Sequence, residues 1–520
     1  IKVPTSVLSR FVVLPKTDDK TYIILLDDVI RHGLPGIFSI FGYDQFKAYT
    51  IKFTRDAEMD FENDVSKSFL EVMTESLKQR KMGSPVRFIY DKAMPNDLLE
   101  LLMKKLGITA YDTVSKRGRY HNFKDFMAFP DLKRPDLENP PAPPLPHAAL
   151  SLQTSIFDVL KQRDIMLHYP YQSYYYVIDL LREASIDPKV RAIKITLYRV
   201  ARFSNVINAL INAARNGKQV TVFLELQARF DEAANIYWSE KLIEEGVKII
   251  HTIPGTKVHS KLLLIRRKEN GINVYYASVG TGNFNEQTAR VYADDSLLTS
   301  RKEIVADVNK VFHMFDAKYQ PPRFKCLVVA PFDMRNFFIR LLNREIRNAQ
   351  QGKEAWAIIK LNSLSDEKIV KKLYQASQAG VKLRLIIRGI CVLVPGIPGL
   401  SDNIEAISIV DKFLEHSRVF IFCNGGDEQY YISSADWMIR NFDNRIEVAC
   451  PILDPNIQKE LRDMLEIQWR DNQKARLVNV NPINSYRKTG SEEKIRAQVA
   501  IYEYFRKKSE SPLKKPDTEN

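Results

Sequence analysis

The stretch AARNGKQVTVFLELQAR (residues 213–229) and its counterpart ASQAGVKLRLIIRG (residues 376–389) decide the fold predicted from this sequence. In each, a helix ends at a glycine and a short apolar strand follows. Another apolar strand precedes each helix, AIKITLY at residues 192–198 and AIIKL at residues 357–361. Short apolar strands that alternate with helices indicate a parallel or mixed sheet covered by helices.

A third element also occurs twice, in the same order along the chain. HSKLLLI (residues 259–265) is followed by YASVGTGNFNE (residues 276–286), and HSRVFIF (residues 416–422) is followed by YYISSADWMIRN (residues 430–441). Three matching elements in one order indicate that a single α/β unit has been duplicated. Because equivalent loops of a duplicated unit converge, we expect the active site in the cleft between the copies.

The prolines of residues 139–146, NPPAPPLP, predict an extended linker, because proline continues neither a helix nor a central strand. The predicted domains are therefore residues 1–146, a mixed α+β head ending in the linker, and two catalytic α/β domains at residues 147–326 and 327–520. In the head we find no catalytic set of residues. Its predicted elements are strands at residues 10–14 and 22–26 and helices at residues 61–79 and 96–106, the last capped by Asn96.

Composition narrows the class of partner. The 520 residues include 77 Lys and Arg against 63 Asp and Glu, a formal charge of +14, which favours nucleic acid, a membrane surface or a phosphate compound as the partner.

No apolar run reaches the roughly 18 residues of a membrane span, which excludes an integral membrane protein. Four scattered cysteines fit buried thiols in a reducing cytosol and argue against a zinc site. Without an initiator Met or a signal peptide at its start, the chain is expected to be a fragment or a processed form.

The chemistry suggested by the residues alone centres on His259 and Lys261. Pleating places both side chains on one face of a strand, where the imidazole can attack phosphorus and the ammonium can hold its oxygens. The glycine turn at residues 280–286 is expected to lead into a helix whose N-terminal N–H groups face the same phosphate. The second copy carries His416 and Arg418. A phosphotransferase, a phosphodiesterase or nuclease, and a non-catalytic protein that binds polyanions all fit this pattern.

An HxK strand followed by a G-T-x-N turn, present twice in outline, resembles the phospholipase D superfamily. That motif usually has Asp five residues after the Lys, where this chain has Arg266, and the second copy has Arg418 in place of Lys. Both differences argue against hydrolysis of a phosphodiester. The chain more closely resembles the bacterial polyphosphate kinase family, the ATP-dependent type with a phosphohistidine intermediate. The matching segments include AIKITLYRVA, LELQARFDEAANI, GTGNFNEQTARVYADDSLLT, LEHSRVFIF and SSADWMIRNFDNRIEVA.

The resemblance implies an α/β fold of two duplicated phospholipase D-like catalytic domains after a mixed α+β head, without the family's N-terminal helical domain. It also implies roles for individual residues. His259 is the histidine that becomes phosphorylated, and His416 either acts as a general acid/base or binds the leaving phosphate. The other implied sites are ATP contacts at Tyr292, Arg388 and His416, a basic residue of the phosphate tunnel at Arg445, and arginines near the phosphates and the metal at Arg199 and Arg229.

Three further residues complete the predicted site. Lys261 holds phosphate oxygens, and Asn283 in the glycine turn contacts the nucleotide. Asp294 is predicted to accept the second ring N–H of His259 and so to set its tautomer. The surrounding arginines are expected to lower the pKa of His259 and keep the attacking nitrogen neutral.

The implied substrates are ATP or ADP and inorganic polyphosphate, with Mg²⁺ as cofactor. Arginine cannot ligate a cation, so any metal role of Arg199 and Arg229 must run through shared phosphate oxygens. Nucleic acid is not expected as a partner, because the basic residues lie beside a nucleophile motif and not along a recognition helix. The resemblance further implies a cytoplasmic homo-oligomer, a dimer or tetramer, for which peripheral membrane association is allowed.

Overall fold

The computed structural model describes residues 1–5, 7–55, 85–108, 113–151, 153–201, 203–226, 232–250, 256–316, 322–480, 484–488 and 493–510. Contacts between residues divide the chain into two compact units, residues 1–140 and residues 141–520. The division falls inside the proline-rich segment that the sequence predicts to be a linker. The domain boundaries predicted at residues 146 and 326 remain predictions.

The first unit is mixed α+β, as predicted. Its three-stranded sheet has the order β3-β4-β5, with β3 antiparallel and β5 parallel to the central strand. Asn96 is the first residue of α4 and not its cap, because Pro95 is the N-cap and no side chain accepts a hydrogen bond there. The helix predicted at residues 61–79 lies outside the described residues. The elements are β1 (Phe11–Val13), β2 (Ile23–Leu25), α1 (Leu26–His32), α2 (Leu34–Ile37), β3 (Ile51–Arg55), β4 (Pro85–Asp91), α4 (Asn96–Leu106) and β5 (Thr113–Arg117).

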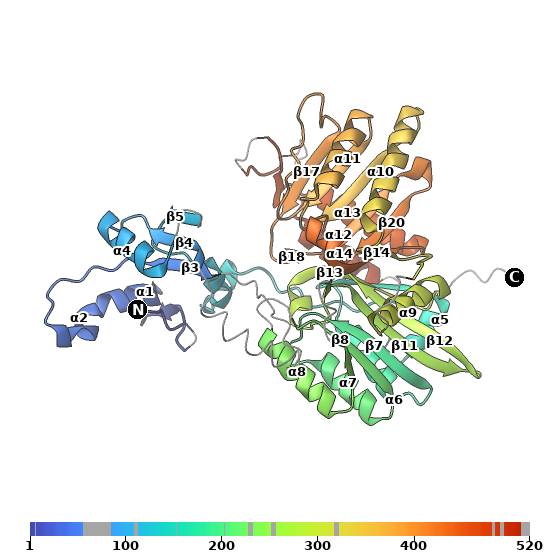
Figure 1. Cartoon of the computed structure of the whole chain (residues 1–520), viewed down its shortest axis with the longest axis horizontal. Coiled ribbons are helices and arrows are strands. Elements are labelled where there is room, and N and C mark those ends of the chain that lie inside the picture. The colour runs from blue at the N-terminus through green and yellow to red at the C-terminus, as the bar shows by residue number, and fades with distance from the viewer. Residues whose placement is uncertain are drawn as a thin grey trace. The chain divides into compact units, whose positions relative to one another are not determined.

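The second unit contains the predicted duplication (Figure 1). Its first half is built from α5 (Ile156–Gln162), β6 (Ile165–Tyr169), α6 (Tyr175–Ile186), β7 (Val190–Leu197), α7 (Asn205–Arg215), β8 (Gln219–Leu224), α8 (Glu232–Glu244), β9 (Lys248–Ile250), β10 (Lys257–Val258), β11 (Lys261–Glu269), β12 (Ile272–Gly280), β13 (Tyr292–Thr299) and α9 (Lys302–Asp316). Its sheet has the order β18-β13-β12-β11-β7-β8-β9, in which β18 (Leu414–Glu415) comes from the second half, and β6 pairs with β13.

The second half repeats this plan. It is built from β14 (Val328–Ala330), α10 (Met334–Gln350), β15 (Trp356–Leu361), α11 (Glu367–Gln378), β16 (Lys382–Ile387), β17 (Ile404–Ile409), β18 (Leu414–Glu415), β19 (Arg418–Phe422), β20 (Gln429–Ser433), α12 (Ile439–Asp443), β21 (Arg445–Pro451), α13 (Pro455–Trp469), β22 (Ala475–Leu477) and α14 (Ala497–Glu510). Its sheet has the order β10-β21-β20-β19-β15-β16-β17-β22, and β14 pairs with β21.

Each half lends a short strand to the other half's sheet. Strand β10 of the first half pairs in parallel with β21, and β18 of the second half pairs in parallel with β13. These two strands immediately precede His259 and His416. The exchange therefore brings the two histidine segments to the junction of the sheets, which explains why the site needs both copies.

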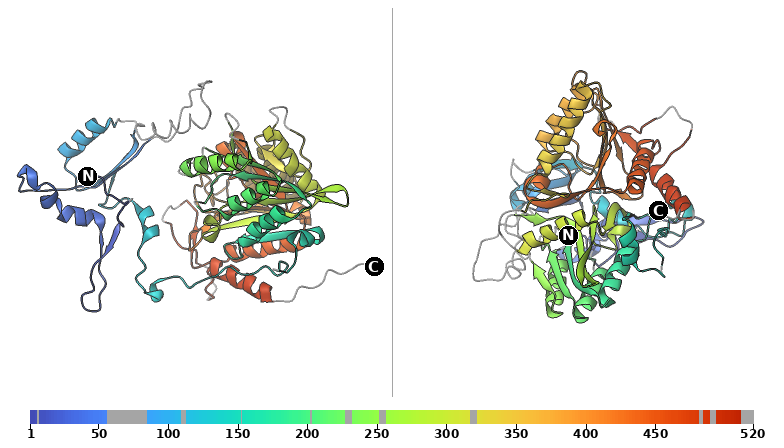
Figure 2. Two further views of the ribbon diagram at one scale, coloured as in Figure 1. Left: turned by 90° about the horizontal axis from the view of Figure 1, so that it is seen from below. Right: turned by 90° about the vertical axis from the view of Figure 1, so that its right-hand side faces the viewer.

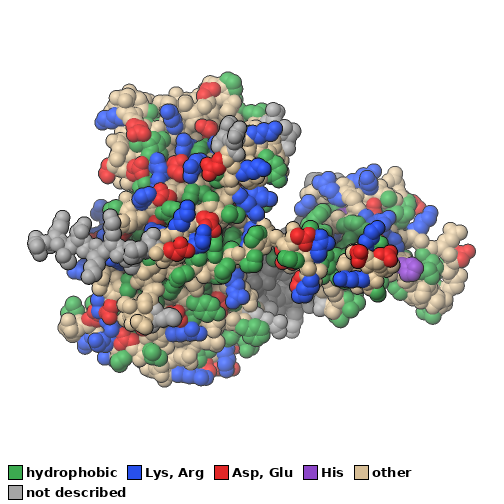
Figure 3. Space-filling model, turned by 180° about the vertical axis from the view of Figure 1, so that it is seen from behind, with side chains coloured by type: hydrophobic (Ala, Val, Ile, Leu, Met, Phe, Trp, Pro, Cys, Tyr) green, Lys and Arg blue, Asp and Glu red, His purple; other side chains and the backbone are tan. Residues whose placement is uncertain are grey.

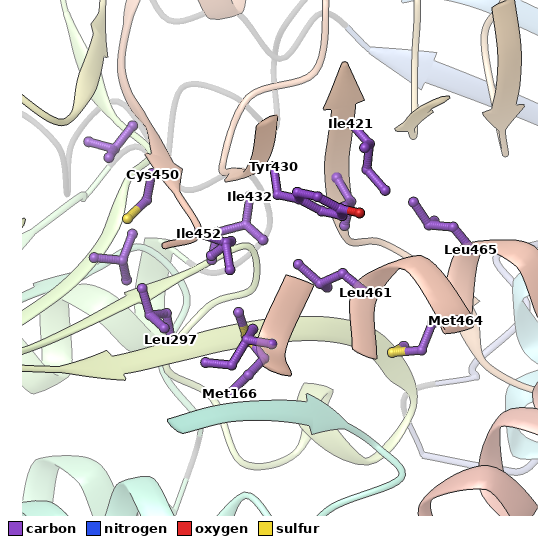
Figure 4. Close-up of a cluster of buried hydrophobic side chains, with 14 of the residues drawn as sticks. Met166, Leu297, Ile421, Tyr430, Ile432, Cys450, Ile452, Leu461, Met464 and Leu465 are labelled. Atoms are coloured by element: carbon purple, nitrogen blue, oxygen red, sulfur yellow. The ribbon is translucent and has the colours of Figure 1, made fainter. Parts of the chain in front are cut away.

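Helices cover the sheets on both faces, so the predicted α/β class is confirmed (Figures 1 and 2). Some of the strands between them are buried along their length, as in β6 and β19, all five residues of which are buried. One buried cluster joins the halves: residues of α9, α13 and both sheets belong to it. In Figure 4, Met166 and Leu297 of the first half lie near Ile432 and Ile452 of the second. This shared core packs the two halves against each other.

The described residues include no helix that is both long enough and apolar enough to cross a bilayer. All four cysteines are free thiols, with Cys423 and Cys450 buried. The core therefore contains no disulfide among these four residues.

Candidate active site

The exchanged strands anchor each histidine on the opposite half. The backbone N–H of His259 donates to the carbonyl of Ile446, 3.0 Å away on β21. The backbone N–H of His416 donates to the carbonyl of Ala293, also at 3.0 Å, on β13. The two contacts are equivalent under the repeat. Each imidazole is thus fixed by a strand that lies far away in the sequence.

Each histidine also takes its carboxylate partner from the opposite half. Nδ1 of His259 lies 2.9 Å from a carboxylate oxygen of Glu447, and Nδ1 of His416 lies 2.8 Å from Asp294. The prediction that Asp294 orients His259 is therefore wrong. Asp294 is the third residue of β13 as Glu447 is of β21, and strand exchange directs each carboxylate to the histidine of the other copy.

Short polar side chains hold both carboxylates in place. The hydroxyl of Thr281 donates to Asp294 at 2.7 Å. Glu447 accepts from the hydroxyl of Ser434 and from the amide of Asn441, the latter at 2.6 Å. Since each carboxylate is fixed by a second partner, the orientation of each imidazole is fixed as well.

Burial lowers the pKa of His259 well below its ordinary value, and the nearby positive charges of Lys261, Arg445 and Arg418 lower it further. Burial raises the pKa of Glu447 against the opposing effect of Lys261 and Arg445. The imidazole is consequently neutral at pH 7. With its Nδ1–H donated to Glu447, it keeps a lone pair on Nε2 for attack on an electrophile.

The basic residue two positions after each histidine bonds back to that histidine's carbonyl oxygen. Lys261 donates from Nζ to His259, and Nη1 of Arg418 donates to His416 at 2.6 Å. Burial lowers the pKa of Lys261 to about 7, opposed by Glu447. Arg418 is held by Asp436, 3.2 Å from Nη2. Two buried basic side chains, Lys261 and Arg418, therefore flank the histidine pair.

Tyr198 is a site residue that sequence reasoning missed. Its ring lies 4.9 Å from the imidazole of His259, edge to face, and Nζ of Lys261 lies 5.5 Å from its centroid. Burial raises the pKa of Tyr198, whereas Arg445 and Arg199 act in the opposite direction. Both predicted arginines are thus close to the tyrosine that packs on His259. Glu447 was missed too, although the repeat aligns it with Asp294.

The predicted nucleotide contacts gather around His416. The ring of Tyr292 lies 5.3 Å from its imidazole. Arg388 donates from Nη2 to Asn362 at 2.8 Å and from Nε to the carbonyl of Glu415 at 2.9 Å. Tyr292 and Arg388 therefore lie on the same side of the site as His416. Whether they contact ATP stays a prediction.

The remaining predicted residues have mixed outcomes. Nη1 of Arg445 lies 4.0 Å from Glu447, beside His259. Oδ1 of Asn283 is buried without a hydrogen-bond partner and lines a small cavity behind Asp294. Arg229 lies outside the described residues.

The glycine turn does not lead into a helix, so the predicted phosphate site at a helix N-terminus is wrong. After Gly280 the chain makes only a short 3₁₀ turn at Thr288–Arg290 and enters β13. Gly282 is needed for space. A Cβ atom there would clash with a carboxylate oxygen of Asp294. The glycine lets the turn pass against the carboxylate that binds His416.

The site combines two partly exposed imidazoles, whose side chains are 12% and 15% exposed, with several fixed cations, a composition suited to phosphoryl transfer. The transition state of phosphoryl transfer needs charge stabilisation and in-line positioning more than covalent help from the protein. On the face drawn in Figure 3, basic and acidic side chains are interspersed without a single basic patch.

Comparisons with known proteins also indicate phosphoryl transfer, and they cover nearly all of the chain. Three family models match: the polyphosphate kinase middle domain over residues 1–129, C-terminal domain 1 over residues 155–321 and C-terminal domain 2 over residues 327–498. A polyphosphate kinase of Vibrio vulnificus (strain YJ016) is 51% identical over 509 residues, covering 97% of this chain and 73% of that protein. One of Escherichia coli (strain K12) is 48% identical over 511 residues, covering 97% and 74%.

Among solved structures, the crystal structure of polyphosphate kinase from Porphyromonas gingivalis superimposes with a TM-score of 0.84. Its sequence is 40% identical, and the match covers 98% of this chain and 74% of that one. The similarity therefore extends over both compact units.

Proposed function

The chain belongs to the polyphosphate kinase family and is an ATP:polyphosphate phosphotransferase, and we propose that the transfer runs through a phosphohistidine at His259. The observation that carries this proposal is the neutral, largely buried imidazole of His259, whose Nδ1 is held by Glu447 beside Lys261, Arg418 and Arg445. A neutral ring with one nitrogen already engaged offers the other to the γ-phosphorus.

In the first step, the lone pair of His259 Nε2 forms the N–P bond. The bond between the γ-phosphorus and the β–γ bridging oxygen breaks, and ADP leaves with the electron pair. The ring becomes positively charged, and the Nδ1–H donated to Glu447 stabilises that charge. In the second step, a terminal oxygen of polyphosphate attacks the phosphorus and the N–P bond breaks, which restores neutral His259.

The cations and the second histidine assist both steps. Lys261 and Arg445 stabilise charge on the transferred phosphoryl oxygens, as fixed cations do in other phosphoryl transfers. We assign Arg199 and Arg229 to the neighbouring phosphates on the family resemblance. His416, held by Asp294, assists departure of the ADP phosphate, with Tyr292 and Arg388 on the nucleotide side.

Mg²⁺ enters as the complex with ATP. The carboxylates near the histidines do not fit a metal site, because Asp294 binds His416, Glu447 binds His259 and Asp436 binds Arg418. Among the described residues, no group of three or more His, Cys, Asp or Glu side chains is arranged to hold a metal ion. The ion is therefore assigned to phosphate oxygens and water, and no step of the proposed mechanism runs through it.

Assembly and location follow from the family resemblance. We propose a cytoplasmic homo-oligomer, a dimer or tetramer, with any membrane contact peripheral and with no nucleic acid partner. Light scattering on the purified chain tests the assembly, and cell fractionation tests the location.

Brief incubation with γ-³²P-labelled ATP and Mg²⁺, followed by denaturation, tests the intermediate. We expect protein-bound label that is acid-labile and alkali-stable, that peptide mapping places on residue 259 and that His259→Ala lacks. Addition of polyphosphate should move the label into acid-insoluble polymer. Label that persists in His259→Ala would overturn the assignment of the nucleophile, and release only as free phosphate would overturn polymer synthesis. Because the chain covers 73% of the V. vulnificus relative, a full-length relative serves as the positive control.

A further inference from the structure

A second cluster of cationic and polar side chains lies away from the histidines, in a cavity of about 170 Å³ between the first sheet and α9. The side chains that concern us are Lys194, Gln219, Arg266, Tyr275, Asn309 and His313. Arg266 follows Lys261 by five residues on β11, which separates the two by ~17 Å along an extended strand. The cavity is therefore distinct from the proposed transfer site.

The second half has the equivalent cavity, of about 230 Å³, between its sheet and α13. Gln219 begins β8 as Lys382 begins β16. Asn309 is the eighth residue of α9 as Arg462 is of α13, and His313 is the twelfth residue of α9 where α13 has Glu466. The two cavities are thus one feature of the fold with different residues.

The difference in charge between the two cavities is what suggests a ligand. In the second half, Glu466 lies 3.3 Å from both Arg384 and Arg462, so a carboxylate neutralises the guanidinium groups that line the cavity. In the first half His313 replaces that carboxylate. None of the described residues that line the first cavity is Asp or Glu.

Among the residues that line the first cavity, Arg266 gives the strongest indication of a bound anion. One terminal nitrogen donates to the side-chain oxygen of Gln219 at 3.1 Å, while its Nε is buried without an acceptor. Buried N–H groups in proteins are nearly always paired, so the unpaired Nε of Arg266, a residue that lines the cavity, indicates a missing acceptor. Guanidinium groups match the oxygens of phosphate-type anions in a bidentate manner.

We propose that Arg266, with the N–H of His313 and the hydroxyl of Tyr275, binds a small phosphate-type anion, orthophosphate or pyrophosphate. The cavity has room for an anion of that size, whereas pockets for larger organic ligands usually exceed ~300 Å³. Arg266 occupies the position at which the resembling phospholipase D motif has Asp, so this chain has a cation where that motif has an anion. The proposal does not depend on a phosphohistidine intermediate.

Calorimetric titration of the whole chain with pyrophosphate tests the site. We expect Arg266→Gln to remove one class of binding site or to weaken it at least tenfold. His313→Glu, which introduces the residue found in the second half, should have the same effect. Lys382→Gln is the matched control, because it changes the equivalent cavity and should leave this binding unchanged. Circular dichroism establishes that each variant is folded.

Unchanged stoichiometry and affinity in both Arg266→Gln and His313→Glu would overturn the proposal, as would loss of the site in Lys382→Gln alone. Crystals soaked with tungstate, an electron-dense phosphate analogue, give the location directly, and density is expected beside the guanidinium of Arg266. Density confined to the histidines would contradict the proposal. If long polyphosphate binds in a manner that requires Arg266 but pyrophosphate does not bind, the assignment to a small free anion is wrong.

Discussion

The two halves of the catalytic unit place the same histidine in different surroundings. His259 lies beside Lys261 and is held by Glu447, whereas His416 lies beside Arg418 and is held by Asp294. Nη1 of Arg418 lies 3.2 Å from both ring nitrogens of His416. Among the described residues, no side chain but Glu447 forms a hydrogen bond with the ring nitrogens of His259.

This difference shows how the two copies of a duplicated site can have two roles. A permanent cation against the ring of His416 makes that imidazole a poor nucleophile, because the attack would leave a positive charge on a ring whose two nitrogens both lie 3.2 Å from Nη1 of Arg418. The side chain of Lys261 turns to the backbone and leaves the ring of His259 open. Although burial disfavours the charged form, His416 and Arg418 hold the pKa of Asp294 below its usual range, whereas burial raises the pKa of Glu447. The copies thus differ in charge more than in shape.

The largest expected effect separates the two histidines. His259→Ala should abolish formation of the phosphoenzyme, a loss of about 10⁴-fold or more, since the other imidazole of the site, His416, lies against Arg418. His416→Ala should still form label on residue 259, slowed about 10²-fold by loss of an acid/base group. Rapid-quench labelling with radioactive ATP measures both. The reverse pattern would show that the roles of the two copies are exchanged.

Removing the charge of each carboxylate sharpens the comparison. Glu447→Gln should slow label formation by roughly 10³-fold, because the tautomer and the positive charge of phospho-His259 lose their support. Asp294→Asn should slow the same step by less than about tenfold, since its partner is not the attacking group. The two variants are compared in single-turnover experiments at saturating ATP. Equal effects would mean that the carboxylates do not distinguish the histidines.

The turn beside each carboxylate offers a third pair of variants. Gly282→Ala puts a methyl group against Asp294, and we expect about a tenfold loss of activity with a destabilisation of about 1–3 kcal/mol. In the second copy the equivalent residue is already Ala435, and Ala435→Gly should cost about 1 kcal/mol or less. Steady-state assays and thermal unfolding give both quantities. If Gly282→Ala leaves both activity and stability unchanged, the close approach of residue 282 to Asp294 does not have the role assigned to it.

The smallest effect is a shift in pH dependence. Since the pKa of Lys261 is about 7, its ammonium form is lost as pH rises through that value, and kcat/KM for ATP should fall above it. Lys261→Arg keeps its charge and should remove this decline, at a cost of a few-fold at pH 7. Because the pKa of His259 is well below its ordinary value, no loss through that residue is expected between pH 7 and 6. A decline that persists in Lys261→Arg would assign it to another group.

Much of the fold follows from local pattern. The glycines after the repeated helices and the apolar strands that follow them predicted where α7 and α11 end and that β8 and β16 come next. Two predictions made from the local sequence were wrong. Asn96 resembles a cap but begins α4, and the glycine turn resembles the start of a helix but leads into β13. At α4 the preceding Pro95 takes the N-cap position, whereas at the glycine turn the packing of Gly282 against Asp294 of β13 accompanies the course of the backbone.

By itself, the sequence determined the duplicated α/β plan, the pair of histidines and the family, because helix stops, strand periodicity and motif spacing are properties of neighbouring residues. Only the tertiary structure decided which carboxylate serves which histidine. Strands β10 and β18 cross to the opposite sheets, so Glu447 reaches His259 across 188 positions and Asp294 reaches His416 across 122. No local pattern encodes that exchange, since the hydrogen bonds that fix it are formed between the two copies.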